Sequence, residues 1–359
     1  MKAVRLFILC AMIFTPSFAH ASSIIISPSG TEDSKAINAA LTGHSVVILS
    51  AGSFQVCSPI VIPRNKGLVG YGVGRYYNGF GARPLPWPGT NLHCPNNGTF
   101  NNGDAYIVMH DNTFVSGFSI TGQQQLAGKQ VNCINAISAS GITVERMTLD
   151  SCYVGVNLVS DGSKPGDTGI TNTQEAHITE NLFWHTQSHG IVTSTINGGA
   201  GTSDFQINNN HFETVCGDSI QLNLVLSAQV NNNYIEDGCG VGIRIVSSQL
   251  VLASGNFFSR IFPFLLQDAH NITINNTLGG GNGHNTAPMF AFYGTNDHLV
   301  IGPQMAAWGT TATYMVNPGA VVTNSQFFDA FSNAAAKQFV DAATQNMLYP
   351  QFVGKWAQP

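Results

Sequence analysis

Short stretches of alternating apolar and polar residues recur along most of the chain. Each unit has an aliphatic residue, which we take as position zero, then small or Asn-rich residues, then a second apolar residue at position five. The pairs are Val115/Ile120, Val144/Leu149, Ile178/Phe183, Ile207/Phe212, Val230/Ile235, Leu252/Phe257, Val300/Met305 and Val322/Phe327. Ile274 opens one more unit, in which Gly279 replaces the second apolar residue. The pattern is that of a chain built from internal repeats.

The length of the repeat identifies the element that it contains. Successive position-zero residues are 29, 34, 29, 23, 22, 22, 26 and 22 residues apart. Helical repeats of this length would need long amphipathic segments, whereas these units are short runs such as Ile243 to Ile245. Corners rich in Asn, as at 208–210, 231–233 and 275–276, separate the runs. Asn tolerates left-handed backbone, and Asn side chains stacked in equivalent corners can form a ladder. We therefore predict a β-solenoid.

The two ends of a solenoid expose its core and need covers. Residues Asp33 to Leu41 predict a short amphipathic helix that caps one end. Asp329 to Met347 predict a second helix, with Phe331, Ala335 and Phe339 on one side. This C-terminal helix (about 329–347) would cap the other end or form an oligomer contact.

Residues 1–21 have the pattern of a secretory signal peptide. Lys2 and Arg5 precede the apolar run Leu6 to Phe14, and Ala19 to Ala21 is a small-x-small cleavage site. Residues 22–359 then form one β-solenoid domain with core coils at about 44–328. This part has 12 basic and 19 acidic residues, a net charge of −7. Such a charge argues against nucleic acid and anionic membrane as partners. We expect a secreted or periplasmic protein.

Six cysteines remain after a signal peptide is removed, and an even number in an exported chain predicts disulfides. Cys216 and Cys239 both fall at position nine of consecutive units. Stacked strands lie about 4.8 Å apart, within the reach of a disulfide. We predict a Cys216–Cys239 bridge, with buried free thiols as the alternative. The pairs Cys133–Cys152 and Cys57–Cys94 follow by elimination. Because no Cys/His cluster has zinc spacing, we expect no structural metal site.

The opening of the chain resembles a known superfamily. The residues are Thr31 to Leu41, Val46 to Phe54, Ile60 to Pro63 and Gly67 to Gly72. They resemble the first coil of the pectate-lyase-like proteins, which include polygalacturonase-type glycosidases, polysaccharide lyases, uronate epimerases and phage tailspikes. The resemblance implies an all-β, right-handed, single-stranded parallel β-helix of roughly ten coils that acts on a polysaccharide. The motifs Asn-Thr-Asp and Asp-Asp of the polygalacturonases are absent from this sequence.

The repeat also aligns candidate catalytic residues. Position six should point outward and contains Asp150, Trp184, Glu213, Glu236 and Phe258 in successive units. Glu213 and Glu236 would be neighbours about 5 Å apart, so that one stays protonated. An acid beside a carboxylate is the arrangement for glycosidic cleavage with retention. Trp184 would stack on sugar. His185 and Asp237 share the next position, and one of them or His189 would assist the catalytic pair. Ordinary solvated surface is the alternative interpretation.

A second group contains His189 and Asp218 at position eleven and Arg244 at position fourteen. His189 is a candidate general base or acid, Asp218 would orient it, and Arg244 would bind a carboxylate. Strict alternation buries position eleven, so only a turn just before it would expose the first two. A buried, hydrogen-bonded His–Asp pair is therefore the alternative.

The sequence leaves three functions open. The preferred one is an exported hydrolase that cleaves glycosidic bonds of a polysaccharide without a cofactor, with Glu213 and Glu236 as the catalytic pair. The second is β-elimination or C5-epimerisation at a uronic acid, with Arg244 and His189, and calcium is a candidate cofactor for a lyase. The third is a non-catalytic carbohydrate-binding or adhesive β-solenoid.

Overall fold

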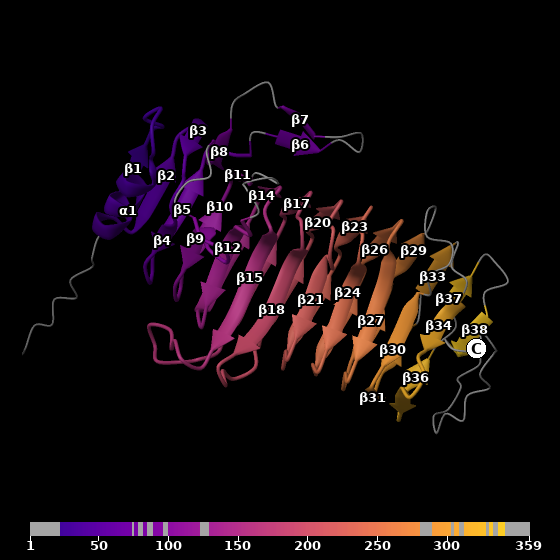
Figure 1. The fold of residues 1–359 in the computed structure, drawn as a ribbon. Coiled ribbons are helices and arrows are strands. Elements are labelled where there is room, and N and C mark those ends of the chain that lie inside the picture. Colours follow the sequence, from indigo (N-terminus) through magenta and orange to yellow (C-terminus); the bar gives the residue numbers. More distant parts are fainter. Residues whose placement is uncertain are drawn as a thin grey trace, which may run out of the picture.

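The computed structural model describes residues 22–73, 75–77, 82–84, 89–95, 100–122, 129–280, 289–302, 305–308, 312–327, 330–332 and 337–341. Strands lie side by side along the length of the molecule, from an indigo N-terminal end to a yellow C-terminal end (Figure 1). Three parallel sheets contain most of these strands. Each turn of the chain adds one strand to each sheet, which is the architecture of a parallel β-helix.

The first sheet contains the position-zero residues. In spatial order its strands are β1 (Ser23–Ile26), β2 (Val46–Leu49), β5 (Gly67–Gly70), β10 (Phe114–Ser116), β13 (Ser140–Glu145), β16 (Gln174–Thr179), β19 (Phe205–Asn208), β22 (Ala228–Asn231), β25 (Val251–Ser254), β28 (Thr273–Asn275), β32 (Val300–Ile301) and β36 (Gln326–Phe327). Val144, Ile178, Ile207 and Val230 are successive partners and all are buried. These position-zero residues therefore lie on the inward face of the sheet, as the repeat predicts.

The second sheet contains the position-five residues and both candidate glutamates. Its strands are β3 (Gly52–Gln55), β8 (Thr90–His93), β11 (Ser119–Thr121), β14 (Thr148–Asp150), β17 (Leu182–Trp184), β20 (His211–Glu213), β23 (Tyr234–Glu236), β26 (Phe257–Ser259), β29 (Leu278–Gly280), β33 (Met305–Trp308) and β37 (Ala330–Ser332). Leu149, Phe183, Phe212 and Ile235 are successive partners that point inward and are buried.

The third sheet closes the coil and contains His189 and Arg244. Its strands are β4 (Ile60–Ile62), β9 (Ala105–Met109), β12 (Asn132–Ile137), β15 (Val154–Asp161), β18 (His189–Ile196), β21 (Ile220–Asn223), β24 (Val241–Val246), β27 (Phe262–Gln267), β30 (Phe290–Tyr293), β34 (Ala312–Val316) and β38 (Lys337–Asp341). Two small pairs stand apart: β6 (Arg75–Tyr77) with β7 (Ala82–Pro84), and β31 (Thr295–Asp297) with β35 (Val321–Thr323).

The asparagine ladder that the corners predicted is present between the first and second sheets. Asn181, Asn210, Asn233 and Asn256 are buried, and each amide nitrogen of the first three donates to the next side-chain oxygen, at 3.0 to 3.1 Å. The residue before Asn210 and Asn233 is another Asn, with φ of 58° and 55°. The left-handed residue turns the chain, and the following Asn satisfies backbone groups inside the turn.

The ends of the solenoid differ from one another. The N-terminal helix is present as α1 (Ser34–Gly43), which buries Ile37 and Leu41 against the core at the N-terminal end (Figure 1). The predicted C-terminal helix is wrong within the described residues, because β37 and β38 occupy part of that segment. They pair with β33 and β34 of the preceding coil, and this pairing outweighs the helical preference of the local sequence.

Two of the three predicted disulfides are confirmed. Cys57 is bonded to Cys94, and Cys133 to Cys152. The predicted Cys216–Cys239 bridge is not formed. These residues do stack in consecutive coils, but both are exposed free thiols whose Sγ atoms lie 3.0 Å apart in a hydrogen bond. The alternative of buried thiols is also wrong, because the turn that contains them lies on the surface.

No helix within the described ranges has the length and apolar character needed to cross a membrane. Residues 1–21, where we expect a signal peptide, lie outside the described part of the chain.

Candidate active site

Glu213 and Glu236 are direct partners in the pairing of β20 with β23. Asp150, Trp184 and Glu213 precede Glu236 in the same row of partners, as the repeat predicts. The prediction fails at the next coil, where Ser259 rather than Phe258 follows Glu236. Leu252 was taken as the inward residue of that coil, but it is 37% exposed and Ala253 points inward instead. The outward row therefore shifts by one residue.

The carboxylate of Glu236 is enclosed by hydrogen-bond donors. It is 7% exposed, and Nε2 of His211 lies 3.0 Å from its Oε1. The Tyr234 hydroxyl donates to its Oε2 at 3.3 Å. A guanidinium nitrogen of Arg260 lies 3.8 Å from the same oxygen. These contacts fix the position of Glu236.

Glu213 extends the same cluster. It is half-buried, and one ligand-type atom from each of His211, Glu213 and Glu236 lies within 4.8 Å of the others. The two carboxyl groups are therefore close enough to share a single substrate bond. This separation matches the spacing of about 5 Å in retaining glycosidases and is shorter than the 6.5–9.5 Å or so of inverting ones.

Burial sets the charge of the aromatic partners. It lowers the pKa of His211 below its usual value, although the contact with Glu236 acts in the opposite direction. Burial and the nearby Glu236 charge raise the pKa of Tyr234. Both side chains are thus neutral near pH 7. A neutral His211 ring with its proton on Nε2 can donate a hydrogen bond to Oε1 of Glu236.

The turns that follow strands of the second sheet contain His185 and Asp237, the other two predicted residues. His185 and Asp237 have left-handed φ values of 51° and 53°, and so does Arg260, at 53°. The His185 ring stacks on Trp184, with ring centroids 4.2 Å apart, and its Nδ1 lies 3.8 Å from Asp150. Arg260 forms an ion pair with Asp237. The second-sheet candidates therefore form one continuous surface with Glu213 and Glu236.

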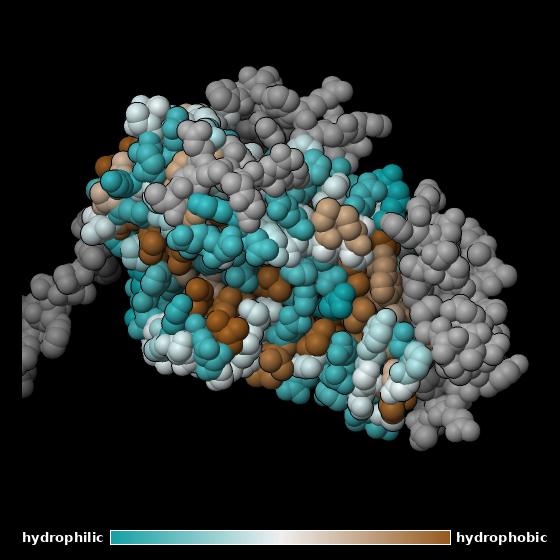
Figure 2. Space-filling model, in the orientation of Figure 1, coloured by the Kyte–Doolittle hydropathy of each residue, from teal (hydrophilic) through white to brown (hydrophobic). Residues whose placement is uncertain are grey.

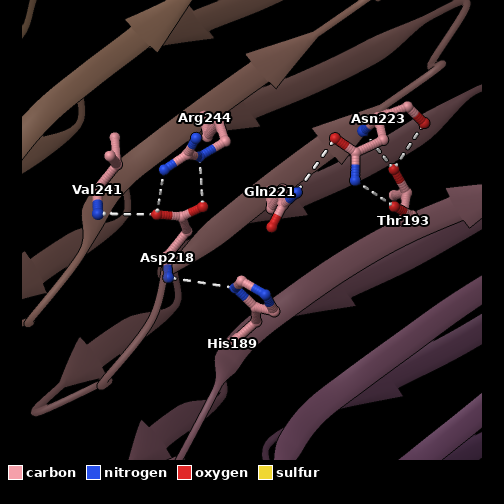
Figure 3. A network of polar contacts seen from close by, with 7 residues as sticks. All are labelled: His189, Thr193, Asp218, Gln221, Asn223, Val241 and Arg244. Carbon is pink, nitrogen blue, oxygen red and sulfur yellow. Dashed lines mark hydrogen bonds and ion pairs between the residues drawn. The ribbon is translucent and has the colours of Figure 1, made fainter.

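The third-sheet candidates form a separate network (Figure 3). Nε of Arg244 donates to Asp218 Oδ2 at 2.6 Å, and Nη2 lies 3.4 Å from Oδ1. The backbone N–H of Val241 donates to the same carboxylate at 2.9 Å. Asp218 is 5% exposed. Its buried charge is therefore balanced by Arg244 and not by His189.

His189 contacts the backbone of Asp218 instead of its carboxylate. The Asp218 N–H donates to His189 Nδ1 at 3.2 Å, so the neutral ring carries its proton on Nε2 (Figure 3). Burial lowers the pKa of His189, with the Asp218 charge acting in the opposite direction. His189 and Asp218 are therefore in contact. Their hydrogen bond, however, occupies Nδ1, the unprotonated ring nitrogen that a general base would use. One edge of the Arg244 guanidinium is likewise already engaged.

The sequence interpretation missed His211, Tyr234 and Arg260. His211 and Tyr234 stand two residues before Glu213 and Glu236, and residues two apart in a strand share a face. That rule alone would have found both. Arg260 could be placed only with the correct alignment of the next coil. We had aligned that coil on Leu252, which is exposed.

Among the described residues, His211, Glu213 and Glu236 are the group that could hold a metal ion. The mixed nitrogen and oxygen ligands suit a transition metal better than calcium, which prefers oxygen. The Glu236 carboxylate already contacts the Arg260 guanidinium, His211 and Tyr234. A bound cation would have to displace these partners. The fit to a metal is therefore poor.

The face of the molecule formed by the third sheet, with β15, β18, β21 and β24, carries hydrophobic patches between polar ones (Figure 2). Val192 and Leu265 belong to the same outward row as Gln221 and Arg244. These four residues of the third sheet include no carboxylate, whereas Glu213 and Glu236 are adjacent on the second sheet.

No family model matches the chain, and no curated protein matches it. Solved structures do. An A-module of the mannuronan C-5 epimerase AlgE6 from Azotobacter vinelandii is 14% identical with a TM-score of 0.57, covering 91% of this chain and 96% of that one. PfbA, a surface adhesin of Streptococcus pneumoniae, is 11% identical with a TM-score of 0.62, covering 92% and 96%. The catalytic domain of a GH87 α-1,3-glucanase, in complex with tetrasaccharides, is 14% identical with a TM-score of 0.56, covering 94% and 68%. The chain thus shares the right-handed parallel β-helix fold of these proteins.

Proposed function

We propose that the protein is a polysaccharide-active enzyme that hydrolyses glycosidic bonds on its second sheet. The observation that carries the proposal is the direct pairing of Glu213 with Glu236, with both carboxyl groups in one cluster. Charged residues are only 9% of this chain, so four acids in one small outward region are unusual for it. They are Asp150, Glu213, Glu236 and Asp237.

The contacts divide the roles between the two glutamates. Glu236 is held by His211, Tyr234 and Arg260 and acts as the nucleophile. A second negative charge within 4.8 Å is unfavourable, so Glu213 carries the proton and acts as the general acid. Glu213 protonates the leaving oxygen while Glu236 bonds to the anomeric carbon. The glycosidic bond breaks in this step and leaves a glycosyl ester on Glu236. Water then gives a proton to Glu213 while its oxygen bonds to the anomeric carbon, which breaks the ester and releases the sugar with retained configuration.

The neighbouring residues position the pair and the sugar. Asp237 holds Arg260 beside Glu236, which makes it a positioning residue. Trp184, with His185 stacked on it, offers an apolar surface to a pyranose ring one coil before Glu213. No cofactor enters this reaction.

The proposed export is compatible with a polymeric substrate outside the cell. Two disulfides indicate an oxidising compartment, and the proposed signal peptide would direct the chain to the periplasm or the medium. The similar structures include an epimerase of mannuronan and a glucanase with bound tetrasaccharides, so the fold is compatible with polysaccharide chemistry.

A non-catalytic carbohydrate-binding or adhesive role is the second candidate, and the similarity to a surface adhesin favours it. Elimination or epimerisation at a uronate has weaker support. It would use His189 and Arg244, yet Nδ1 of His189 accepts a backbone hydrogen bond and Arg244 is paired with Asp218.

The test is incubation of the protein with neutral, amino-sugar and uronic-acid polysaccharides, with and without calcium. New reducing ends and the ultraviolet absorbance of unsaturated uronates are recorded together. Hydrolysis gives reducing ends without absorbance. Both signals together would replace the proposal with a lyase, and neither signal with any polymer would favour the binding protein or an epimerase.

A further inference from the structure

Two exposed thiols lie next to each other in the turns that join the second sheet to the third. Cys216 and Cys239 stand three residues after Glu213 and Glu236, in consecutive coils. Their Sγ atoms are 3.0 Å apart and share a hydrogen bond, and both residues are exposed. The other four cysteines of the described residues are joined in disulfides. We call Cys216 and Cys239 the thiol pair.

The backbone holds the thiol pair in register. The N–H groups of Cys216 and Cys239 each donate to a carbonyl of the preceding coil, at 3.0 and 2.8 Å. A glycine follows each cysteine. A Cβ at Gly217 would lie 2.0 Å from the Ser188 carbonyl oxygen, and a Cβ at Gly240 would lie 2.5 Å from the Gly217 oxygen. Because only glycine allows such a close approach, the sequence Cys-Gly in both coils stacks the turns and places the thiols side by side.

Two sulfur ligands restrict the kind of cation that the thiol pair can bind. Zinc takes four protein ligands in structural sites and three in catalytic sites, and iron–sulfur clusters need four cysteines. Within the described residues, no further His, Cys, Asp or Glu ligand atom forms a group with the two sulfurs. Soft thiolate ligands select soft cations such as Cu(I). The thiol pair therefore suits a soft cation whose coordination is completed by two thiolates.

The spacing of the coils fits such a cation. A cation between two sulfurs, with bonds of the zinc–sulfur length of about 2.3 Å, separates the sulfurs by up to about 4.6 Å. Side chains that extend in parallel from stacked strands are about 4.8 Å apart. The sulfurs lie 3.0 Å apart in their hydrogen bond. An outward rotation of the two exposed side chains therefore converts this contact into a sulfur–cation–sulfur bridge.

We propose that the thiol pair is a surface binding site for one soft monovalent cation of the Cu(I) type. On binding, the two S–H bonds break, two metal–sulfur bonds form and two protons pass to solvent, and no atom changes its oxidation state. The bound cation links the two coils that contain Glu213 and Glu236. It takes no part in the proposed hydrolysis, so the two proposals are tested separately.

The test is a titration with Cu(I) under anaerobic conditions, which keep the thiols reduced. The affinity is measured by competition with a coloured Cu(I) chelator, and Zn²⁺ is titrated separately. Cys216→Ser and Cys239→Ser each remove one ligand. Thr214→Ser, a change in the same turn that keeps both thiols, is the control. All proteins contain Cys10→Ser, so that the cysteine of residues 1–21 does not contribute. Circular dichroism confirms that each variant is folded.

We expect the parent protein to bind one Cu(I) at the thiol pair. Cys216→Ser and Cys239→Ser should each weaken this binding about a hundredfold, because a single thiolate remains, and Thr214→Ser should leave it unchanged. Bound Cu(I) should also block alkylation of both cysteines. Cu(I) affinity that neither cysteine variant changes, alkylation that Cu(I) does not slow, or Zn²⁺ bound as tightly as Cu(I) through the thiol pair would overturn the proposal.

Discussion

Glu213 and Glu236 face each other across a single step of the β-helix, with their strands in direct register. The two positions are equivalent in the repeat, but their surroundings are not. Glu236 is buried among His211, Tyr234 and Arg260, whereas Glu213 is half-buried in the coil before it. One repeated position thus provides two carboxyl groups with different environments, as acid and nucleophile require.

The Asp218–Arg244 pair should stabilise the fold. Arg244→Ala removes the side-chain partner of a buried carboxylate, and we expect it to lower the free energy of unfolding by about 2–3 kcal/mol. Asp218→Asn should lower the free energy of unfolding less in the Arg244→Ala background than in the wild type. In the double variant the buried carboxylate that lost its partner is itself replaced by a neutral side chain. Urea denaturation of the four proteins gives the coupling energy, and additive effects would show that the pair does not interact.

The asparagine ladder makes a second stability prediction. Asn233→Ala removes the acceptor of the Asn210 N–H and the donor to the Ile207 carbonyl, both inside the turn. We expect a loss of about 3 kcal/mol in unfolding free energy. Asn232→Gly is the control, because the residue is exposed with φ of 55° and Gly accepts this conformation. If Asn233→Ala and Asn232→Gly have similar melting temperatures, the ladder contributes little.

His211 should make stability depend on pH. Its pKa in the folded protein is below the unfolded value of 6.5, because burial disfavours the imidazolium. Between these two pKa values the unfolded chain binds more protons than the folded one. The contribution of His211 is therefore complete above pH 6.5 and is lost as the pH falls below it. Melting temperatures should fall more steeply across this range for the wild type than for His211→Gln, and equal slopes would be evidence against it.

The cysteines should differ in reactivity. Cys216 and Cys239 are exposed thiols, whereas Cys57, Cys94, Cys133 and Cys152 are bonded. Alkylation of the folded protein followed by peptide mapping should label only the first two of these six. The pKa of Cys239 is raised to about 11 by its hydrogen bond to Cys216, so alkylation of Cys239 should be slow at neutral pH. Mapping that shows the Cys216 and Cys239 peptides joined would contradict the structure.

The inward face of the solenoid could be predicted from the sequence, because each coil needs an apolar residue at the same buried position, as at Val144, Ile178 and Ile207. The pairing of Glu213 with Glu236 could be predicted for the same reason, because each follows such a buried residue at the same spacing. Leu252 broke the frame because an exposed leucine is indistinguishable from a buried one in a local pattern. The C-terminal strands were missed because they depend on pairing with the preceding coil, which outweighs local helical preference. The Asp218–Arg244 pair joins two strands, and only the structure shows its geometry.

The central claim is that Glu213 and Glu236 together cleave a glycosidic bond. The measurement that tests it most directly is the turnover number of Glu236→Gln on a polysaccharide that the wild type hydrolyses. Glu175→Gln, the same change on the first sheet at an exposed residue, is the control. We predict that Glu236→Gln lowers the turnover number by about a thousandfold or more while Glu175→Gln leaves it unchanged. A folded Glu236→Gln protein with wild-type turnover would contradict the account.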